Sequence, residues 1–202
     1  MSGFVRQFFS WVFHPIFMPL VACLVMWYAF PSLVSRLQKP EVIILSGILL
    51  LNTILIPGMA TFYLAQKKII SSLHLPEKNE RRIPFLVTAV SYSVACYLIR
   101  ELRLPTPFYL VLLGASAASI IALIVNYKWK ISIHMVGMGG ITGIIASVFN
   151  EAANDLLYLF MLQVILSGVV GSVRIAGHEH SSEQIYTGFA VGFFCEYLIL
   201  NL

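Results

Sequence analysis

Residues 42–65 read VIILSGILLLNTILIPGMATFYLA, a stretch that contains no charged side chain. About 20 consecutive apolar residues are enough to cross the hydrocarbon core of a bilayer as an α-helix. The rest of the chain has the same character, since 59% of its 202 residues are hydrophobic, 11% are charged, and the mean hydropathy is +0.87. Soluble domains carry about 25% charged residues. The composition therefore indicates an integral membrane protein.

Similar apolar stretches recur along the whole chain. Together with 42–65 they predict crossings near 11–30, 84–102, 108–128, 134–150, 156–173 and 184–200. The stretch 134–150 is short and rich in glycine, so we expect six or seven transmembrane helices. The predicted fold is all-α, a polytopic helical bundle that forms one integral membrane domain over 1–202 in the cell membrane. Glycines at three- and four-residue steps in the later crossings favour close helix packing, and the sequence leaves open whether the protein is a homo-oligomer.

The charged residues and cysteines exclude several classes of function. The 13 Lys and Arg residues exceed the 9 Asp and Glu residues, which gives a net charge of +4. In such an apolar chain this excess is typical of loops near lipid headgroups, and no basic groove with interleaved aromatics indicates a nucleic-acid partner. Cys23, Cys96 and Cys195 lie in apolar segments without a CxxC pair. A disulfide framework or thiolate metal site is therefore not expected.

Three polar clusters interrupt the apolar chain, at 78–84, 130–134 and 174–184. Two apolar stretches separate each cluster from the next. Because an even number of crossings returns the chain to the same side of the membrane, all three clusters should lie at one face. The sequence therefore predicts a site built from all three, within residues 78–192.

The third cluster combines a lone cation with a histidine. Arg174 is the only Lys or Arg after Lys130, and His180 follows it with five residues between them. A guanidinium at membrane depth needs a partner, and its fork of donors suits a phosphate. A neutral histidine beside bound phosphate can act as a nucleophile, and Gln184, one helical turn later, can orient its ring through the amide oxygen. The alternatives are an interfacial arginine and a histidine in a solvated loop, with metal ligation by His178–His180 less favoured.

The other two clusters add a proton donor and more positive charge. Ser132 and His134 stand where a crossing begins, so Ser132 and nearby backbone amides can bind phosphate oxygens while His134 donates a proton to a leaving oxygen. Helix capping by Ser132 and an interfacial histidine are the alternative interpretation. Lys78, Arg81 and Arg82 precede a helix that begins near Pro84. Alone they would be a juxtamembrane basic cluster, whereas with Arg174 they can neutralise a phosphate dianion.

Taken together, the clusters resemble the type 2 phosphatidic acid phosphatase family of membrane lipid phosphatases, which are related to vanadium haloperoxidases. The family pattern is K-x6-R-P, then P-S-G-H, then S-R-x5-H-x3-D. Arg174 and His180 match the third motif, and Ser132 and His134 match the second. The resemblance covers about 78–192, and the earlier helices add only hydrophobic context.

The resemblance implies a role for each matched residue. His180 would be the nucleophile that forms a phosphohistidine, His134 the acid, and Gln184 the residue that orients His180. The implied phosphate ligands are Lys78, Arg82, Ser132 and Arg174. The chain differs from the family pattern in that Ile131 and Ile133 replace Pro and Gly, Val173 replaces Ser, Gln184 replaces Asp, and the first motif is shorter. Because of this shortening, the assignment among Lys78, Arg81 and Arg82 stays open.

The resulting hypothesis is hydrolysis of a lipid phosphate or lipid diphosphate, without a metal ion or other cofactor. An intramembrane prenyltransferase would need Asp-rich clusters to hold Mg²⁺, and Asp155 is the single Asp of the chain. The alternative to an enzyme is a transporter or channel. It is suggested by four polar residues at the expected depth of the membrane, His14, Asn52, Gln163 and Glu196, because polar residues there can mark a transport pathway. Loop charges are too evenly divided to orient the protein in the membrane.

Overall fold

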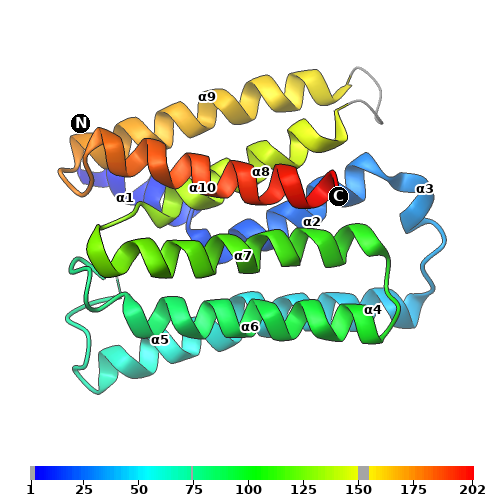
Figure 1. Ribbon diagram of the computed structural model, residues 1–202, viewed down its shortest axis with the longest axis horizontal. Helices are drawn as coiled ribbons and strands as arrows, with labels where there is room; N and C mark the ends of the chain where they lie inside the picture. The colour runs from blue at the N-terminus through cyan, green and yellow to red at the C-terminus, as the bar shows by residue number, and fades with distance from the viewer. Residues whose placement is uncertain (1–2, 74, 150–154) are drawn as a thin grey trace.

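The computed structural model describes residues 3–73, 75–149 and 155–202. These residues form α-helices that run roughly along one direction as a bundle (Figure 1), and no strand occurs among them. The predicted all-α class is confirmed. The helices are α1 (Gly3–Val12), α2 (Met18–Ala29), α3 (Pro31–Val34), α4 (Lys39–Leu49), α5 (Ile56–Gln66), α6 (Arg82–Glu101), α7 (Thr106–Lys128), α8 (Ile133–Val148), α9 (Asp155–Ala176) and α10 (Ser182–Leu200).

Five helical segments of the described chain are long and apolar enough to cross a membrane. They are Gln7–Ala29, Lys39–Gln66, Arg82–Glu101, Thr106–Lys128 and Leu156–Ala176. The expected number of six or seven crossings is not confirmed. Helix α8 has 16 residues, which span about 24 Å at 1.5 Å per residue, less than the roughly 30 Å of a hydrocarbon core. Helix α10 carries polar residues at its start and Glu196 near its end. The expected end of a crossing at Asn150 lies outside the described residues.

The second span contains a π-helical turn, Leu50–Leu55, between α4 and α5. Pro57 has no N–H to offer the Thr53 carbonyl, and the Ile56 N–H reaches back five residues to the Leu51 carbonyl. The Asn52 carbonyl, which loses its usual helical partner, instead accepts a hydrogen bond from Ser91 Oγ at 2.6 Å. The π turn therefore joins this span to α6 through a buried polar contact.

Helices α8 and α10 pack closely because glycines face each other's backbone. A Cβ at Gly192 would overlap the Val136 carbonyl oxygen, and one at Gly139 would overlap the Phe189 carbonyl oxygen. Gly188 in turn lies against the Ser132 carbonyl. Small residues allow such close approach in lipid, where no hydrophobic effect drives helices together. This contact holds the loop before α8 against the start of α10.

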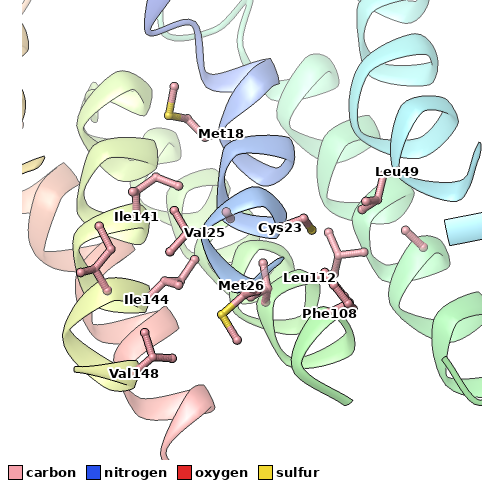
Figure 2. Close-up of a cluster of buried hydrophobic side chains, with 14 of the residues drawn as sticks. Met18, Cys23, Val25, Met26, Leu49, Phe108, Leu112, Ile141, Ile144 and Val148 are labelled. Atoms are coloured by element: carbon pink, nitrogen blue, oxygen red, sulfur yellow. The ribbon is translucent and has the colours of Figure 1, made fainter. Parts of the chain in front are cut away.

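A buried hydrophobic cluster runs through the bundle. Figure 2 shows part of it, with α2 side chains between those of α7 and α8. Met26, Phe108, Leu112 and Ile144 are each at most 2% exposed.

Candidate functional site

All three polar clusters lie at the same end of the bundle. The α5–α6, α7–α8 and α9–α10 connections gather there, on the left in Figure 1, as the even spacing of the crossings predicts. The first helix, α1, also lies at this end of the bundle. Residues far apart in sequence are thus brought to one place.

A cavity of about 590 Å³ opens beneath these connections. Its polar lining at this end includes Arg81, His134, Arg174 and His180, together with Ser10 and His14. Most of the remaining wall is apolar and is contributed by α2, α5, α6, α7 and α8. The volume is in the range of small-molecule sites, which are mostly apolar with a few polar groups that orient the ligand.

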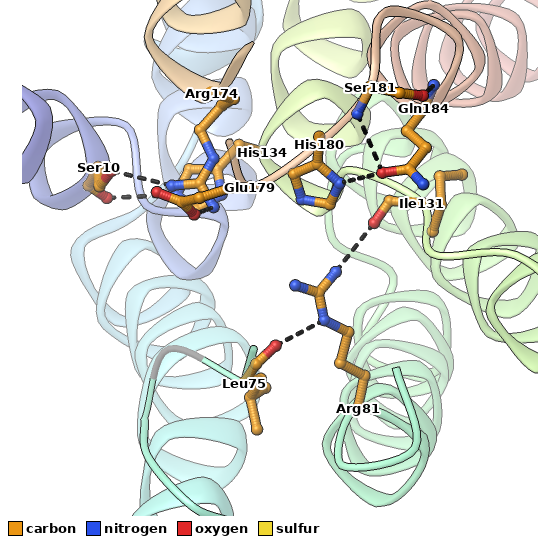
Figure 3. Close-up of polar contacts among 10 residues, drawn as sticks. All are labelled: Ser10, Leu75, Arg81, Ile131, His134, Arg174, Glu179, His180, Ser181 and Gln184. Atoms are coloured by element: carbon orange, nitrogen blue, oxygen red, sulfur yellow. Dashed lines mark hydrogen bonds and ion pairs between the residues drawn. The ribbon is translucent and has the colours of Figure 1, made fainter. Parts of the chain in front are cut away.

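Arg174 lies in the last turn of α9 with only 5% of its surface exposed. Its Nη1 donates to Ser10 Oγ at 2.9 Å, and its Nη2 forms an ion pair with Glu179 (Figure 3). Its Nε is buried without a hydrogen-bond acceptor among the described residues. The Nε–H is therefore available to donate to a ligand. Nη2, in contrast, is already paired with the half-exposed Glu179 carboxylate.

Arg81 contributes a second buried guanidinium from the turn before α6. Its Nε donates to the Leu75 carbonyl at 2.8 Å and its Nη1 to the Ile131 carbonyl at 3.0 Å. The one ion pair among the described residues is Arg174–Glu179, so Arg81 has no carboxylate partner there. Burial, followed by the nearby Arg174 charge, lowers the pKa of Arg81 to about 10. At physiological pH the group is still charged, and it adds a positive charge without a direct carboxylate partner to the cavity mouth.

Lys78 and Arg82, which the sequence interpretation assigned to phosphate, do not line the cavity. Lys78 Nζ donates to the Lys128 carbonyl at 3.4 Å. Arg82 is exposed and lies over the Tyr127 ring, 4.8 Å from its centroid. Successive helical residues point about 100° apart, so only one of the adjacent arginines can face inward. That residue is Arg81, and the structure thus favours it over Arg82.

His180 is held by the start of α10. Its Nδ1 lies 2.9 Å from Gln184 Oε1, which also accepts from the Ser181 N–H at 3.3 Å. Because the Ser181 N–H can only donate, the Gln184 atom that faces it is the oxygen, and His180 Nδ1 must then be the donor. His180 Nε2 is left with its lone pair. Burial, with the charges of Arg81, Arg174 and Lys130, lowers the pKa of His180 to about 4, although Gln184 opposes the shift.

His134 lies at the first turn of α8 and is 7% exposed. Its Nε2 lies 3.3 Å from the Ser10 carbonyl, which only accepts, so Nε2 carries a hydrogen. Its Nδ1 is buried and has no partner among the described residues. Nδ1 therefore carries the lone pair of the neutral ring and is the atom that can take up a proton in the cavity.

Ser132 is at the N-cap of α8, as expected, but its side chain makes no cap hydrogen bond. It is fully buried, and its Oγ has no partner among the described residues. Its backbone N–H faces the Gln184 carbonyl at 3.4 Å. Ser132 does not line the cavity, so a ligand bound in the cavity would not contact it in this arrangement.

Ser10 is the residue that the sequence interpretation missed. Its hydroxyl contacts Arg174 and its carbonyl contacts His134, so the first helix is part of the site and not only hydrophobic context. A single serine in an apolar amphipathic segment is a weak signal, because such residues are common on any helix. Only its contacts identify it.

Among the described residues, no group of three His, Cys, Asp or Glu side chains is arranged to hold a metal ion. The three cysteines of the chain are free thiols. Comparison with models of protein families, with curated proteins and with solved structures finds no match for this chain.

Proposed function

We propose that the protein is a membrane phosphatase that hydrolyses a lipid phosphate or lipid diphosphate through a phosphohistidine, without a metal ion. The observation that carries the proposal is a pair of buried guanidinium groups and a pair of buried imidazoles at one end of an otherwise apolar cavity. A phosphorylated lipid has the matching form, an anion joined to a hydrocarbon chain. Its headgroup would enter from the bilayer and bind between Arg81 and Arg174.

The first chemical step uses His180 as the nucleophile. Its Nε2 lone pair attacks phosphorus, a P–N bond forms, and the P–O bond to the lipid oxygen breaks. His134, which starts the cycle protonated at Nδ1 as an imidazolium, donates that proton to the departing oxygen, so that an alcohol leaves from a monophosphate and a lipid monophosphate leaves from a diphosphate. The two guanidinium groups stabilise the negative charge on the transferring phosphoryl oxygens.

The second step regenerates the enzyme. Water attacks the phosphohistidine, His134 takes a proton from that water, and the P–N bond breaks to release inorganic phosphate. Gln184 keeps the His180 ring in the tautomer that this cycle needs. Glu179 must yield its place on Arg174 to the substrate, and its 43% exposed side chain can move to solvent.

The test is phosphate release by the purified protein from phosphatidic acid, phosphatidylglycerol phosphate and a polyprenyl diphosphate, all in EDTA. The expected result is release in EDTA from at least one of them, with a fall of at least about 10³-fold in His180→Ala. His178→Asn is the matched control, because His178 is exposed in the same loop at φ 55°, which asparagine tolerates. Loss of activity in EDTA, or full activity in His180→Ala, would rule the mechanism out.

A transporter is the second candidate, because His14 and Glu196 also line the cavity. Two of the polar residues that motivated it have structural partners: Asn52 Nδ2 donates to the Ile48 carbonyl and Gln163 Nε2 to the Met138 carbonyl. Transport predicts flux of the lipid phosphate in proteoliposomes that survives His180→Ala. Hydrolysis predicts no such flux.

A further inference from the structure

Glu196 is a buried carboxyl group in the apolar part of the cavity. It lies on α10, is 3% exposed, and lines the same cavity as His134 and His180. Its Oε2 is buried and has no hydrogen-bond partner among the described residues. The hydrolysis proposed above makes no use of this residue.

Two glycines make room for the Glu196 side chain. A Cβ at Gly114 of α7 would lie 2.6 Å from Glu196 Cδ, and one at Gly140 of α8 would lie 3.5 Å from Cγ. Gly140 itself lines the cavity, together with Ala115 of α7. The carboxyl group therefore lies against the cavity wall where three helices meet.

The position of Glu196 along the bundle sets its distance from the phosphate site. Gly140 follows His134 by six residues on α8, which is about 9 Å along the helix axis. The carboxyl group is thus about that much deeper than the imidazole. A lipid bound with its phosphate between the arginines would bring the first part of its chain, rather than its headgroup, to Glu196.

An unsatisfied carboxyl group is costly in such a place. Buried polar atoms without partners are rare in proteins, and an acidic residue at membrane depth usually marks a functional site. A hydroxyl or amide N–H on the substrate chain could donate to the carboxyl group from the cavity side.

We propose that Glu196 is a specificity-determining residue that selects lipid phosphates with a hydroxyl or amide N–H several atoms from the phosphate. The inference rests on the proposed function for the position of the headgroup. A hydrogen-bonding site discriminates against an analogue that lacks the group, because the buried partner is then left unpaired. Plain alkyl and polyprenyl chains would bind the same cavity less tightly.

The experiment uses hexadecyl phosphate and a series of hexadecyl phosphates with one hydroxyl at successive carbons. Hydrolysis is measured as kcat/KM in EDTA, and binding is measured without turnover as the rise in melting temperature of His180→Ala. One hydroxyl position should raise both kcat/KM and the melting temperature, with kcat/KM about tenfold above that of the plain chain. Glu196→Leu should abolish this preference, and Glu196→Gln, which still has an acceptor, should keep part of it.

Gln163→Leu is the matched control, because Gln163 is also buried and polar but hydrogen-bonds the Met138 carbonyl. It should lower the melting temperature and leave the hydroxyl preference unchanged. No preference at any carbon, or a preference that survives Glu196→Leu, overturns the inference. Hydroxyl-dependent binding without hydrolysis by the wild type would support the Glu196 site and contradict the proposed phosphatase.

Discussion

At the scale of residues, the site depends on which of two adjacent arginines faces inward. Arg81 donates to carbonyls on two connections, whereas Arg82 lies over an exposed aromatic ring. A cation that points into the cavity can stabilise a transferring phosphoryl group, and one that points away cannot.

We therefore expect Arg81→Gln to lower kcat/KM for lipid phosphate by about 10²–10³-fold and Arg82→Gln to change it by less than about twofold. Phosphate release on the same preparations measures both. Since Arg81 also joins two loops, the melting temperature of each variant is recorded to separate lost stability from lost catalysis. Equal effects of the two substitutions would contradict the inward role of Arg81.

The pKa of His180 sets a pH dependence. Because the neutral ring is the nucleophile and burial beside three cations lowers its pKa to about 4, kcat/KM should stay high on the acid side and fall only as pH drops through about 4. Gln184→Glu would put a carboxylate at the same acceptor position and raise this pKa. Its acid limb should then move up by about one to two pH units.

The measurement is the pH profile of kcat/KM for wild type and Gln184→Glu in one set of buffers. Glu183→Gln is the control, since Glu183 is exposed at the start of the same helix. It should leave the acid limb unchanged. An acid limb that does not respond to Gln184→Glu would contradict His180 as the titrating nucleophile.

At the scale of elements, the glycine contact between α8 and α10 holds the loop with Ser132 against the helix start with Gln184. These are two of the three connections that carry the site. Their relative position depends on direct contact between the two helix backbones. Any side chain larger than the hydrogen of glycine would prevent that contact.

Gly192→Ala should destabilise the protein by about 1–3 kcal/mol, because the new Cβ would overlap the Val136 carbonyl oxygen. Gly168→Ala is the matched control on α9, where nothing lies within 4 Å of an added Cβ. There alanine should stabilise the helix by about 0.5–1 kcal/mol. Thermal unfolding in detergent, followed by tryptophan fluorescence, compares the two, and similar effects would argue against the close contact.

At the scale of the whole molecule, the bundle has a polar end and an opposite end. The connections with the polar clusters share one end, and the connections α2–α4 and α6–α7 share the other (Figure 1). In a membrane, the two ends should face different compartments.

Single cysteines at Glu77 and Lys128 should react with a membrane-impermeant maleimide from one side, and those at Ser35 and Glu101 from the other. All four positions are exposed. Labelling of intact and of permeabilised cells distinguishes the sides and also orients the protein. The background is a variant in which the native cysteines are replaced by alanine, Cys23, Cys96 and Cys195. Labelling of all four positions from the same side would contradict the arrangement.

Several features could be predicted from sequence because they depend on composition and local spacing. Apolar stretches predict helices in a bilayer whatever their neighbours, and the number of stretches between clusters predicts that the clusters share an end. The contact between His180 and Gln184 was also predicted, although His180 lies just before the N-cap Ser181 and Gln184 in the first turn of α10 reaches back to it. The number of crossings was harder to predict from the sequence. Helix α8 is mostly buried among other helices, so it need not be as long or as apolar as a helix that faces lipid.

The sequence by itself thus determined the all-helical character, the apolar setting and the end of the bundle at which the polar residues meet. The tertiary structure alone decided that Arg81 faces the cavity, that Ser10 contacts Arg174 and His134, and that Glu196 lies in the cavity wall. The physical reason is that each of these depends on how a helix is rotated about its axis and which backbone packs beside it. Those properties follow from contacts between residues far apart in the chain, which no local pattern records.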